Sequence, residues 1–244
     1  MKGSVWRGMH NQSQNELNPR ETHGVGQPEL ERRRGCLSGK RTYEEARERL
    51  CLHVVNYEHW RTHLNNLAYL RWEDLVILFI YEERDGEQLR ENPESETERI
   101  VLSQKDLEAW EVDIYTVFRN AALASCRLHP PVLSSIREIL HIPEEYYGGP
   151  KLYTMSCREY RYGAATIFYP GVLAAIAESF GGDLYIIPSS VHEVLFFLKE
   201  EADEPWKLKE IICSVNREVV LPGEVLSNSL YQYRRQIGEL ERVV

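Results

Sequence analysis

The chain has 244 residues, of which 43% are hydrophobic and 27% charged, a composition typical of a folded protein with a sizeable core. The net charge is −9, but residues 1–40 carry seven basic and four acidic residues, a balance of +3 that leaves −12 for the remainder. An acidic body argues against tight binding of nucleic acid or anionic lipid. No apolar run approaches the ~18 residues of a membrane span, and the first residues lack the apolar core of a secretory signal. We therefore expect a soluble protein with no membrane partner.

The cysteines favour a reducing compartment. There are five of them, an odd number, and no two form a C-x-x-C pair, which argues against a zinc ribbon or a thioredoxin-like site. Free thiols in the cytoplasm are the simplest account. The five are Cys36, Cys51, Cys126, Cys157 and Cys213.

Composition along the chain predicts one folded domain between two tails. Residues 1–41 are rich in Gly, Asn, Gln, Ser and Arg without periodicity, so we expect a disordered polar tail. Residues 42–233 are expected to form a single domain. Residues 234–244 are expected to be a polar carboxy-terminal tail.

The domain is expected to begin with helices and a central strand. Thr42 and Glu45 have the spacing of a capping box, and apolar residues then recur at helical spacing as far as residue 54. A second short helix is expected over residues 64–67. Residues 75–81, LVILFIY, have no polar alternation, which predicts a strand buried on both faces.

The middle of the chain predicts a returning strand and two helices. Residues 99–103 could pair back antiparallel on residues 75–81 after a charged loop. Asp113 can cap a helix with one apolar face, which His129-Pro130-Pro131 stops. Residues 132–140 are expected to be another helix.

The carboxy-terminal part alternates strands and helices. We expect a hairpin of residues 151–156 and 164–169, a helix over 172–180 ended by Gly181-Gly182, and strands over 184–187 and 191–198. Residues 188–190 would form a turn between the last two strands.

A further helix is expected to begin at Pro205, because proline suits the first position of a helix. A helical turn over residues 221–226 and an edge strand at residues 231–233 come next. Together these elements predict an α+β fold whose sheet is mostly antiparallel, with helices packed mainly on one face. The passage from residue 164 to 187 permits one right-handed parallel crossover.

Three segments resemble a known family. They are YGAATIFYPGVL, IIPSSVHEVLFFL and VNREVVLPGEVLSNSLY, and the PSSVHE motif marks the carboxy-terminal half. They resemble an uncharacterised bacterial family, domain of unknown function number 5688, and the similarity reaches back to VVNYE at residues 54–58. The resemblance implies no activity, cofactor or substrate. Family members normally carry a further strand and helix before VVNYE, so a truncated or rearranged member is expected.

The most polar interruption of the apolar centre is Ser189, Ser190, His192 and Glu193. On an extended strand Ser190 and His192 would share one face. A serine, a histidine and a carboxylate suggest a hydrolase, but a triad requires spatial roles, and no G-x-S-x-G elbow is present. The serines could instead bond the turn, with the other two satisfying neighbouring polar groups. A ligand site remains a third interpretation.

A weaker pattern concerns metal binding. His59 and His63 are spaced i, i+4 and could share an ion on a helix face, with His53 as a third ligand and Glu73 or Asp74 nearby. The H-E-x-x-H order is absent, and a solvated polar face explains the same residues. We therefore predict no metal.

Basic and aromatic residues interleave around residues 151–162 and could stack a nucleic-acid strand, but a solvated hairpin tip fits the acidic body better.

We expect a cytoplasmic binding or regulatory module without a cofactor or catalytic activity, acting on an unidentified protein or small molecule. The alternative is a hydrolase with a pocket around Ser190, His192 and Glu193.

Overall fold

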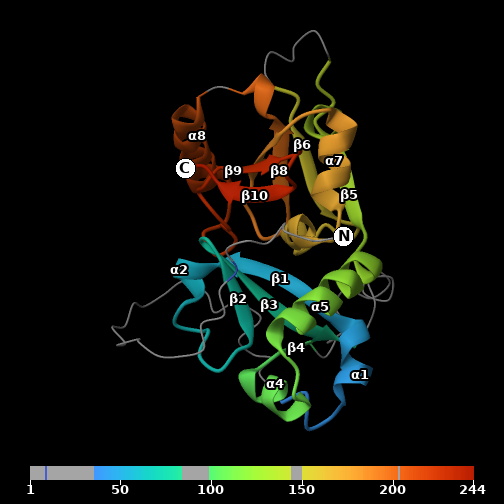
Figure 1. The fold of residues 1–244 in the computed structure, drawn as a ribbon. Coiled ribbons are helices and arrows are strands. Elements are labelled where there is room, and N and C mark those ends of the chain that lie inside the picture. The colour runs from blue at the N-terminus through green and yellow to red at the C-terminus, as the bar shows by residue number, and fades with distance from the viewer. Residues whose placement is uncertain (1–8, 10–35, 84–98, 144–149, 203) are drawn as a thin grey trace. The chain divides into compact units, whose positions relative to one another are not determined.

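The computed structural model describes Met9 and residues 36–83, 99–143, 150–202 and 204–244 (Figure 1). Among these residues the chain forms two compact units, which we call the N-unit, residues 9–130, and the C-unit, residues 131–244. Each combines helices with antiparallel strands, which confirms the α+β class. The expected single domain over residues 42–233 is thus divided between two units. Residues 1–8 and 10–35 of the expected tail lie outside the described residues.

The N-unit contains a four-stranded sheet in the order β1-β3-β2, with β4 also paired to β3. The strands are β1 (Leu50–Asn56), β2 (Tyr69–Trp72), β3 (Leu75–Glu82) and β4 (Arg99–Val101). All three pairings are antiparallel, and every residue of β3 is buried. The predicted central strand and its returning partner are therefore confirmed. The helices are α1 (Tyr43–Ala46), α2 (Tyr57–Trp60), α4 (Gln104–Trp110) and α5 (Ile114–Leu128), with a 3-10 turn η2 (Arg47–Arg49).

The first helix is much shorter than predicted. The capping box of Thr42 and Glu45 is present, but α1 ends at Ala46, and the residues expected to continue it form strand β1. Seven consecutive residues of β1 pair with β3, and its first six residues are buried. Leu, Val and Cys at successive positions fit a helix stripe and a doubly buried strand equally well, so the long pairing with β3 decides the outcome.

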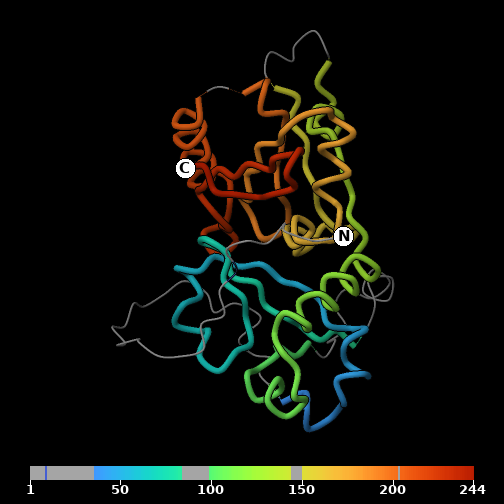
Figure 2. Tube along the Cα trace, viewed as in Figure 1, coloured from blue at the N-terminus to red at the C-terminus, as the bar shows by residue number. Residues whose placement is uncertain are grey.

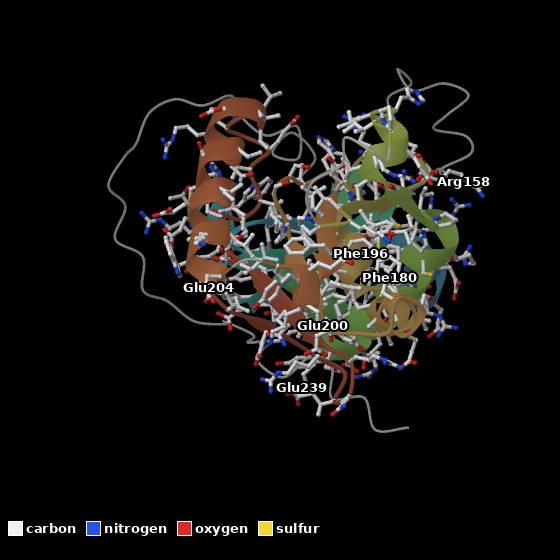
Figure 3. The ribbon with its side chains drawn as sticks, turned by 90° about the horizontal axis from the view of Figure 1, so that it is seen from above. Arg158, Phe180, Phe196, Glu200, Glu204 and Glu239 are labelled. Carbon is white, nitrogen blue, oxygen red and sulfur yellow. The ribbon has the colours of Figure 1, made fainter. Side chains whose placement is uncertain are left out.

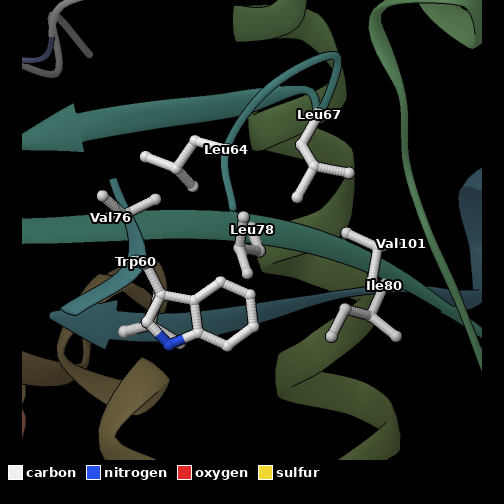
Figure 4. Packing of buried hydrophobic residues seen from close by; sticks show 8 residues of the cluster. Trp60, Leu64, Leu67, Val76, Leu78, Ile80 and Val101 are labelled. Carbon is white, nitrogen blue, oxygen red and sulfur yellow. The ribbon is translucent and has the colours of Figure 1, made fainter. Parts of the chain in front are cut away.

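An apolar cluster on one face of this sheet forms part of the core of the N-unit (Figure 4). Trp60 and Leu64, from the segment after β1, pack on Val76 and Leu78 of β3. Residues 64–67, which were predicted to form a second short helix, form a turn instead, and Leu64 and Leu67 contribute to this cluster. The complete cluster is Val55, Trp60, Leu64, Leu67, Val76, Leu78, Ile80 and Val101.

The N-unit begins before the predicted boundary at residue 42. Leu37 has no exposed surface, and the backbone N–H of Ser38 donates to the Asp106 carboxylate at 2.7 Å. Trp110 Nε1 donates to the carbonyl of Arg41 at 3.0 Å. Residues 36–41 therefore belong to the folded unit and not to a disordered tail.

The C-unit contains a six-stranded sheet in the order β10-β9-β7-β8-β6-β5. Figure 2 traces the same chain as a tube coloured by residue number. The strands are β5 (Pro131–Ser135), β6 (Tyr153–Cys157), β7 (Leu184–Ile187), β8 (Val194–Leu198), β9 (Tyr231–Arg234) and β10 (Glu239–Arg242). The helical elements are α6 (Ile136–Ile139), α7 (Val172–Phe180), α8 (Pro205–Val219) and the 3-10 helices η4 (Gly163–Phe168) and η5 (Lys199–Glu201). All pairings between described strands are antiparallel, so the parallel crossover that the sequence permits does not form there.

Helices α7 and α8 lie on opposite faces of this sheet, as Figure 1 shows. Phe180 of α7 and Phe196 of β8 stack with centroids 5.8 Å apart (Figure 3). Phe197, which points to the other face, packs with Tyr185 and with Ile212 of α8. The C-unit sheet is therefore covered on both faces, whereas the sequence suggested helices mainly on one.

Two predicted elements of the C-unit have the wrong type. Residues 164–169 were expected to be a strand, but residues 164–168 lie in η4, which is buried along its whole length. The partners of β6 are instead β5 and β8. Residues 132–140 were expected to be one helix, but residues 132–135 belong to β5, where they pair with β6, and only residues 136–139 form the short helix α6.

The carboxy-terminal residues complete the sheet. β9 lies between β7 and β10, so it is not the predicted edge strand. β10 lies within residues 234–244, which were expected to be a tail. Gly238 closes the β9–β10 turn with φ of +67°, a conformation that glycine adopts without steric cost.

Candidate functional site

The sequence motif PSSVHE forms the loop between β7 and β8. The predicted strand over 191–198 begins only at Val194, so Ser190 and His192 are not on one face of an extended strand. The hydroxyl oxygen of Ser190 accepts the backbone N–H groups of His192 at 3.2 Å and Glu193 at 3.3 Å. Ser190 thus acts as a turn-forming residue, as in Ser/Thr turns generally.

Both ring nitrogens of His192 are engaged. Nδ1 accepts the backbone N–H of Tyr162 at 3.2 Å, which requires Nδ1 to be unprotonated. The proton of the neutral ring is therefore on Nε2, which lies 3.3 Å from Oε1 of Glu224. A ring held in this way has no nitrogen left to accept a proton from the Ser190 hydroxyl.

The loop is fastened to three other parts of the C-unit. Thr154 of β6 donates its hydroxyl to Glu193 Oε2 at 2.6 Å, and Ser156 donates to the His192 carbonyl at 2.7 Å. On the other side, Ser189 is buried, and its carbonyl accepts the N–H of Leu226 at 3.0 Å. Each of the four predicted site residues therefore makes hydrogen bonds that hold the loop.

A second polar cluster lies in the N-unit, and strand register explains it. Cys51 and His53 lie opposite Ile80 and Leu78, so they face the apolar cluster of Figure 4. Glu82 alternates onto the same face, and Arg99 of β4 lies directly opposite it. Four ionisable side chains thus lie together at one end of the sheet face that carries the apolar cluster: Cys51, His53, Glu82 and Arg99.

Glu82 is the centre of this cluster and is 1% exposed. Its Oε2 lies 2.7 Å from Nε2 of His129, the residue that ends α5. Its Oε1 lies 3.3 Å from Nε of Arg99 and 3.6 Å from Nε2 of His53. One buried carboxylate therefore has two imidazoles and a guanidinium around it.

The electrostatics follow from burial and these contacts. Burial alone would raise the Glu82 pKa, but the hydrogen bonds from His129 and His53 outweigh it. With the nearby charge of Arg99, they hold the Glu82 pKa well below its usual range, so the carboxylate is ionised. Burial lowers the pKa of His53 by more than the Glu82 contact raises it, so that ring is neutral.

Cys51 completes the cluster but is not an activated nucleophile. Its side chain is 1% exposed, and burial is the main cause that raises its thiol pKa, with the Glu82 charge adding to it. Hydrogen bonds with His129 and Ser125 oppose the rise without cancelling it. Catalytic thiols are partly exposed and have lowered pKa values, so this one is a protonated core thiol as the protein stands.

His59 and His63, which the sequence offered only as weak candidates for a metal pair, do not share one regular helix. α2 ends at Trp60, so the helix needed to align His59 with His63 is only one turn long. His63 lies with its ring edge against Trp60, with centroids 6.0 Å apart. Within the described N-unit, the group able to hold an ion is instead Cys51, Glu82 and His129.

One signal in the sequence could have indicated this cluster. Glu82 directly follows a run of apolar residues and lies two residues after Ile80 and four after Leu78. Because side chains alternate between the faces of a strand, its carboxylate points to the same side as theirs, toward the core. A buried charge requires partners, and these came from β1, β4 and the end of α5. Their identity depends on pairings between distant residues, which no local pattern shows.

The structure is that of an α+β protein of two units, each built on an antiparallel sheet. The chain belongs to a family of unknown function, DUF5688, whose model matches residues 30–235. The match spans most of the chain and extends well beyond the carboxy-terminal half that carries the PSSVHE motif. No curated protein and no solved structure matches the chain. Among the described helices, none has the length and apolar character to cross a membrane.

Proposed function

We propose that the protein is a non-catalytic interaction module that binds a second copy of itself through helix α8. The observation that carries the proposal is an apolar ridge on α8. Ile211, Val215 and Val219 are 55%, 42% and 74% exposed, and they follow one another at i, i+4 and i+8. Residues at this spacing form a continuous stripe on a helix.

The ridge is separate from the face that holds α8 on its sheet. Leu208 and Ile212 pack into the cluster with Tyr185 and Phe197, and Asn216 is buried. The ridge residues lie on the flank of that face, so they are not required to attach the helix. Single exposed apolar residues are ordinary, but an aligned row of them is typical of an interaction surface.

Charges beside the ridge favour a second copy as the occupant. Lys207 and Glu218, both exposed, are eleven residues apart, about three helical turns, and lie along the same flank of the ridge. Two α8 helices packed antiparallel about a two-fold axis would bring Lys207 of each copy beside Glu218 of the other. This self-complementarity is what an isologous interface requires.

The PSSVHE loop supports a binding role over the hydrolase alternative. Ser190 accepts two backbone N–H groups, and neither nitrogen of His192 is available as a base. The five cysteines are free thiols, which supports our placing the protein in a reducing cytoplasm, and the family resemblance supports a bacterial one.

The test is the mass of the full-length protein in solution, measured by sedimentation and light scattering over a wide concentration series. We expect a concentration-dependent dimer, which Val215→Lys abolishes by placing a charge in the ridge. Leu123→Lys is the matched control, because Leu123 is an exposed apolar residue, 60% exposed, on α5 of the N-unit.

A charge exchange tests the orientation. Lys207→Glu should weaken the dimer through like charges, and adding Glu218→Lys in the same chain should restore it. A wild-type protein that stays monomeric throughout the series would refute the proposal. A dimer that is unaffected by Val215→Lys would place the interface elsewhere and refute it as well.

A further inference from the structure

We propose that the buried cluster of the N-unit binds a divalent ion of the zinc class through Cys51, Glu82 and His129. The sulfur of Cys51, a carboxylate oxygen of Glu82 and a ring nitrogen of His129 all lie within 4.8 Å of one another. Thiolate, imidazole and carboxylate are the three ligand types that zinc accepts in proteins. This site is independent of the α8 ridge and of the proposed self-association.

The spacing of the three groups suits tetrahedral coordination. Bonds of ~2.0–2.3 Å to a tetrahedral ion hold the ligand atoms roughly 3.3–3.7 Å apart. The 2.7 Å contact between His129 Nε2 and Glu82 Oε2 would therefore open by about 1 Å or less. An ion would take the place of the proton shared in that contact.

Glu82 is oriented for this role by its other neighbours. Arg99 and His53 lie beside Oε1, whereas His129 lies beside Oε2. The guanidinium thus holds the oxygen turned away from His129. Hydrogen-bonded neighbours of this kind orient ligand carboxylates in metal sites generally.

The charges and protons balance when an ion is bound. The Cys51 thiol becomes a thiolate and releases its proton to solvent, while His129 coordinates as a neutral ring. The divalent ion then faces one thiolate and one carboxylate, and the carboxylate remains paired with Arg99. Three protein ligands leave a fourth position for water or another small ligand.

The protein offers a limited route for an ion to reach this position. Cys51 and Glu82 are each 1% exposed, but the His129 side chain keeps 13% of its surface accessible. His129 is also the capping residue directly after α5, and helix ends are prone to fraying. We therefore expect the ion to bind slowly and a chelator to remove it slowly.

The first experiment measures metal in the full-length protein. The purified protein is stripped with a chelator, reloaded with Zn²⁺ alone, and analysed for bound metal per chain. We expect one ion per chain and a rise in melting temperature on loading. A protein that holds no stoichiometric Zn²⁺ after reloading would overturn the proposal and leave the cluster as a buried ionic network.

Cobalt substitution identifies the ligands without relying on any variant. Co²⁺ bound to a thiolate in tetrahedral geometry gives a charge-transfer band in the near ultraviolet and intense visible bands. We expect both in the wild-type protein. A weak octahedral spectrum without the thiolate band would contradict the assignment of Cys51.

Variants then locate the site. Cys51→Ala and His129→Asn should each weaken Zn²⁺ binding at least a hundredfold, and Cys51→Ala should abolish the charge-transfer band. Cys126→Ala, a cysteine of intermediate exposure on α5, is the matched control and should leave both unchanged. Binding that survives Cys51→Ala but is lost in His59→Asn would move the ion elsewhere and refute the proposal.

Discussion

Replacing Gly163 with alanine tests whether the PSSVHE loop is packed as tightly as the structure shows. Gly163 begins η4 at the point where the loop approaches β6. A methyl group on its Cα would overlap Ser156 Oγ and the backbone nitrogen of Cys157, and would stand 2.7 Å from the His192 carbonyl oxygen. Contacts of a real Cβ below 3.0 Å essentially never occur.

The expected cost follows from what must move. Cys157 belongs to β6 and is paired with Pro131, so its backbone cannot retreat without breaking that pairing. Overpacking of this kind costs about 1–3 kcal/mol. Separating the loop from β6 would also break the bond between Ser156 and His192, which is worth about 1–3 kcal/mol when the partners stay buried. We expect Gly163→Ala to destabilise the C-unit by about 2–6 kcal/mol.

Urea unfolding provides the free energy, and amide hydrogen exchange in β6 and β8 locates the loss in the C-unit, because the two units need not unfold together. Gly223→Ala is the matched control: no atom lies within 4 Å of its added methyl. It should change stability by less than about 1 kcal/mol. If Gly163→Ala costs no more than the control, the loop is not packed on β6 and the description of the site is wrong.

Four further predictions concern individual side chains. Ile77→Ala in the fully buried β3 should cost about 2–5 kcal/mol in urea unfolding, and a loss below about 1 kcal/mol would contradict its central position. Leu37→Ala should cost about 2–4 kcal/mol by the same assay, whereas a disordered tail would give no change. His192→Ala should destabilise by more than about 1 kcal/mol through the N–H of Tyr162 left unpaired, and a variant His192→Gln of wild-type stability that loses a ligand would instead show a functional ring. Burial alone would raise the Asp106 pKa, but hydrogen bonds from Ser103 and Ser38 lower it below its ordinary value; its contribution is therefore complete above about pH 4 and is lost as the pH falls further, so thermal melts should show acid destabilisation that Asp106→Asn reduces.

Local chemistry was sufficient to predict several elements from the sequence. Seven apolar residues without alternation identified β3 as central, since strands buried on both faces typically have that pattern. Asp113 caps α5, as its side chain accepts the N–H of Thr116 at 2.9 Å. Pro205 begins α8, where a missing N–H costs nothing. In each case the deciding interaction lies within a few residues of the chain.

Tertiary pairing decided the elements that the sequence predicted wrongly. β1 has the composition of a helix stripe as much as of a strand, and seven pairs with β3 favour the strand. Residues 164–169 have strand-forming side chains, but residues 163–168 form a buried 3-10 helix whose first residue, Gly163, lies against β6 and the loop. Such choices depend on contacts between residues far apart, which propensity does not include.

The same distinction holds for the candidate sites. The sequence alone identified Ser189, Ser190, His192 and Glu193 as a polar interruption in an apolar region, and the structure gave each a hydrogen bond within the loop and its surroundings. The sequence alone could not show that Cys51, Glu82 and His129 come together, because these residues come from two strands and a helix end. Strand register places the first two on one face, and the packing of α5 on β1 delivers the third. A buried charge is determined by its partners, and only the folded chain selects them.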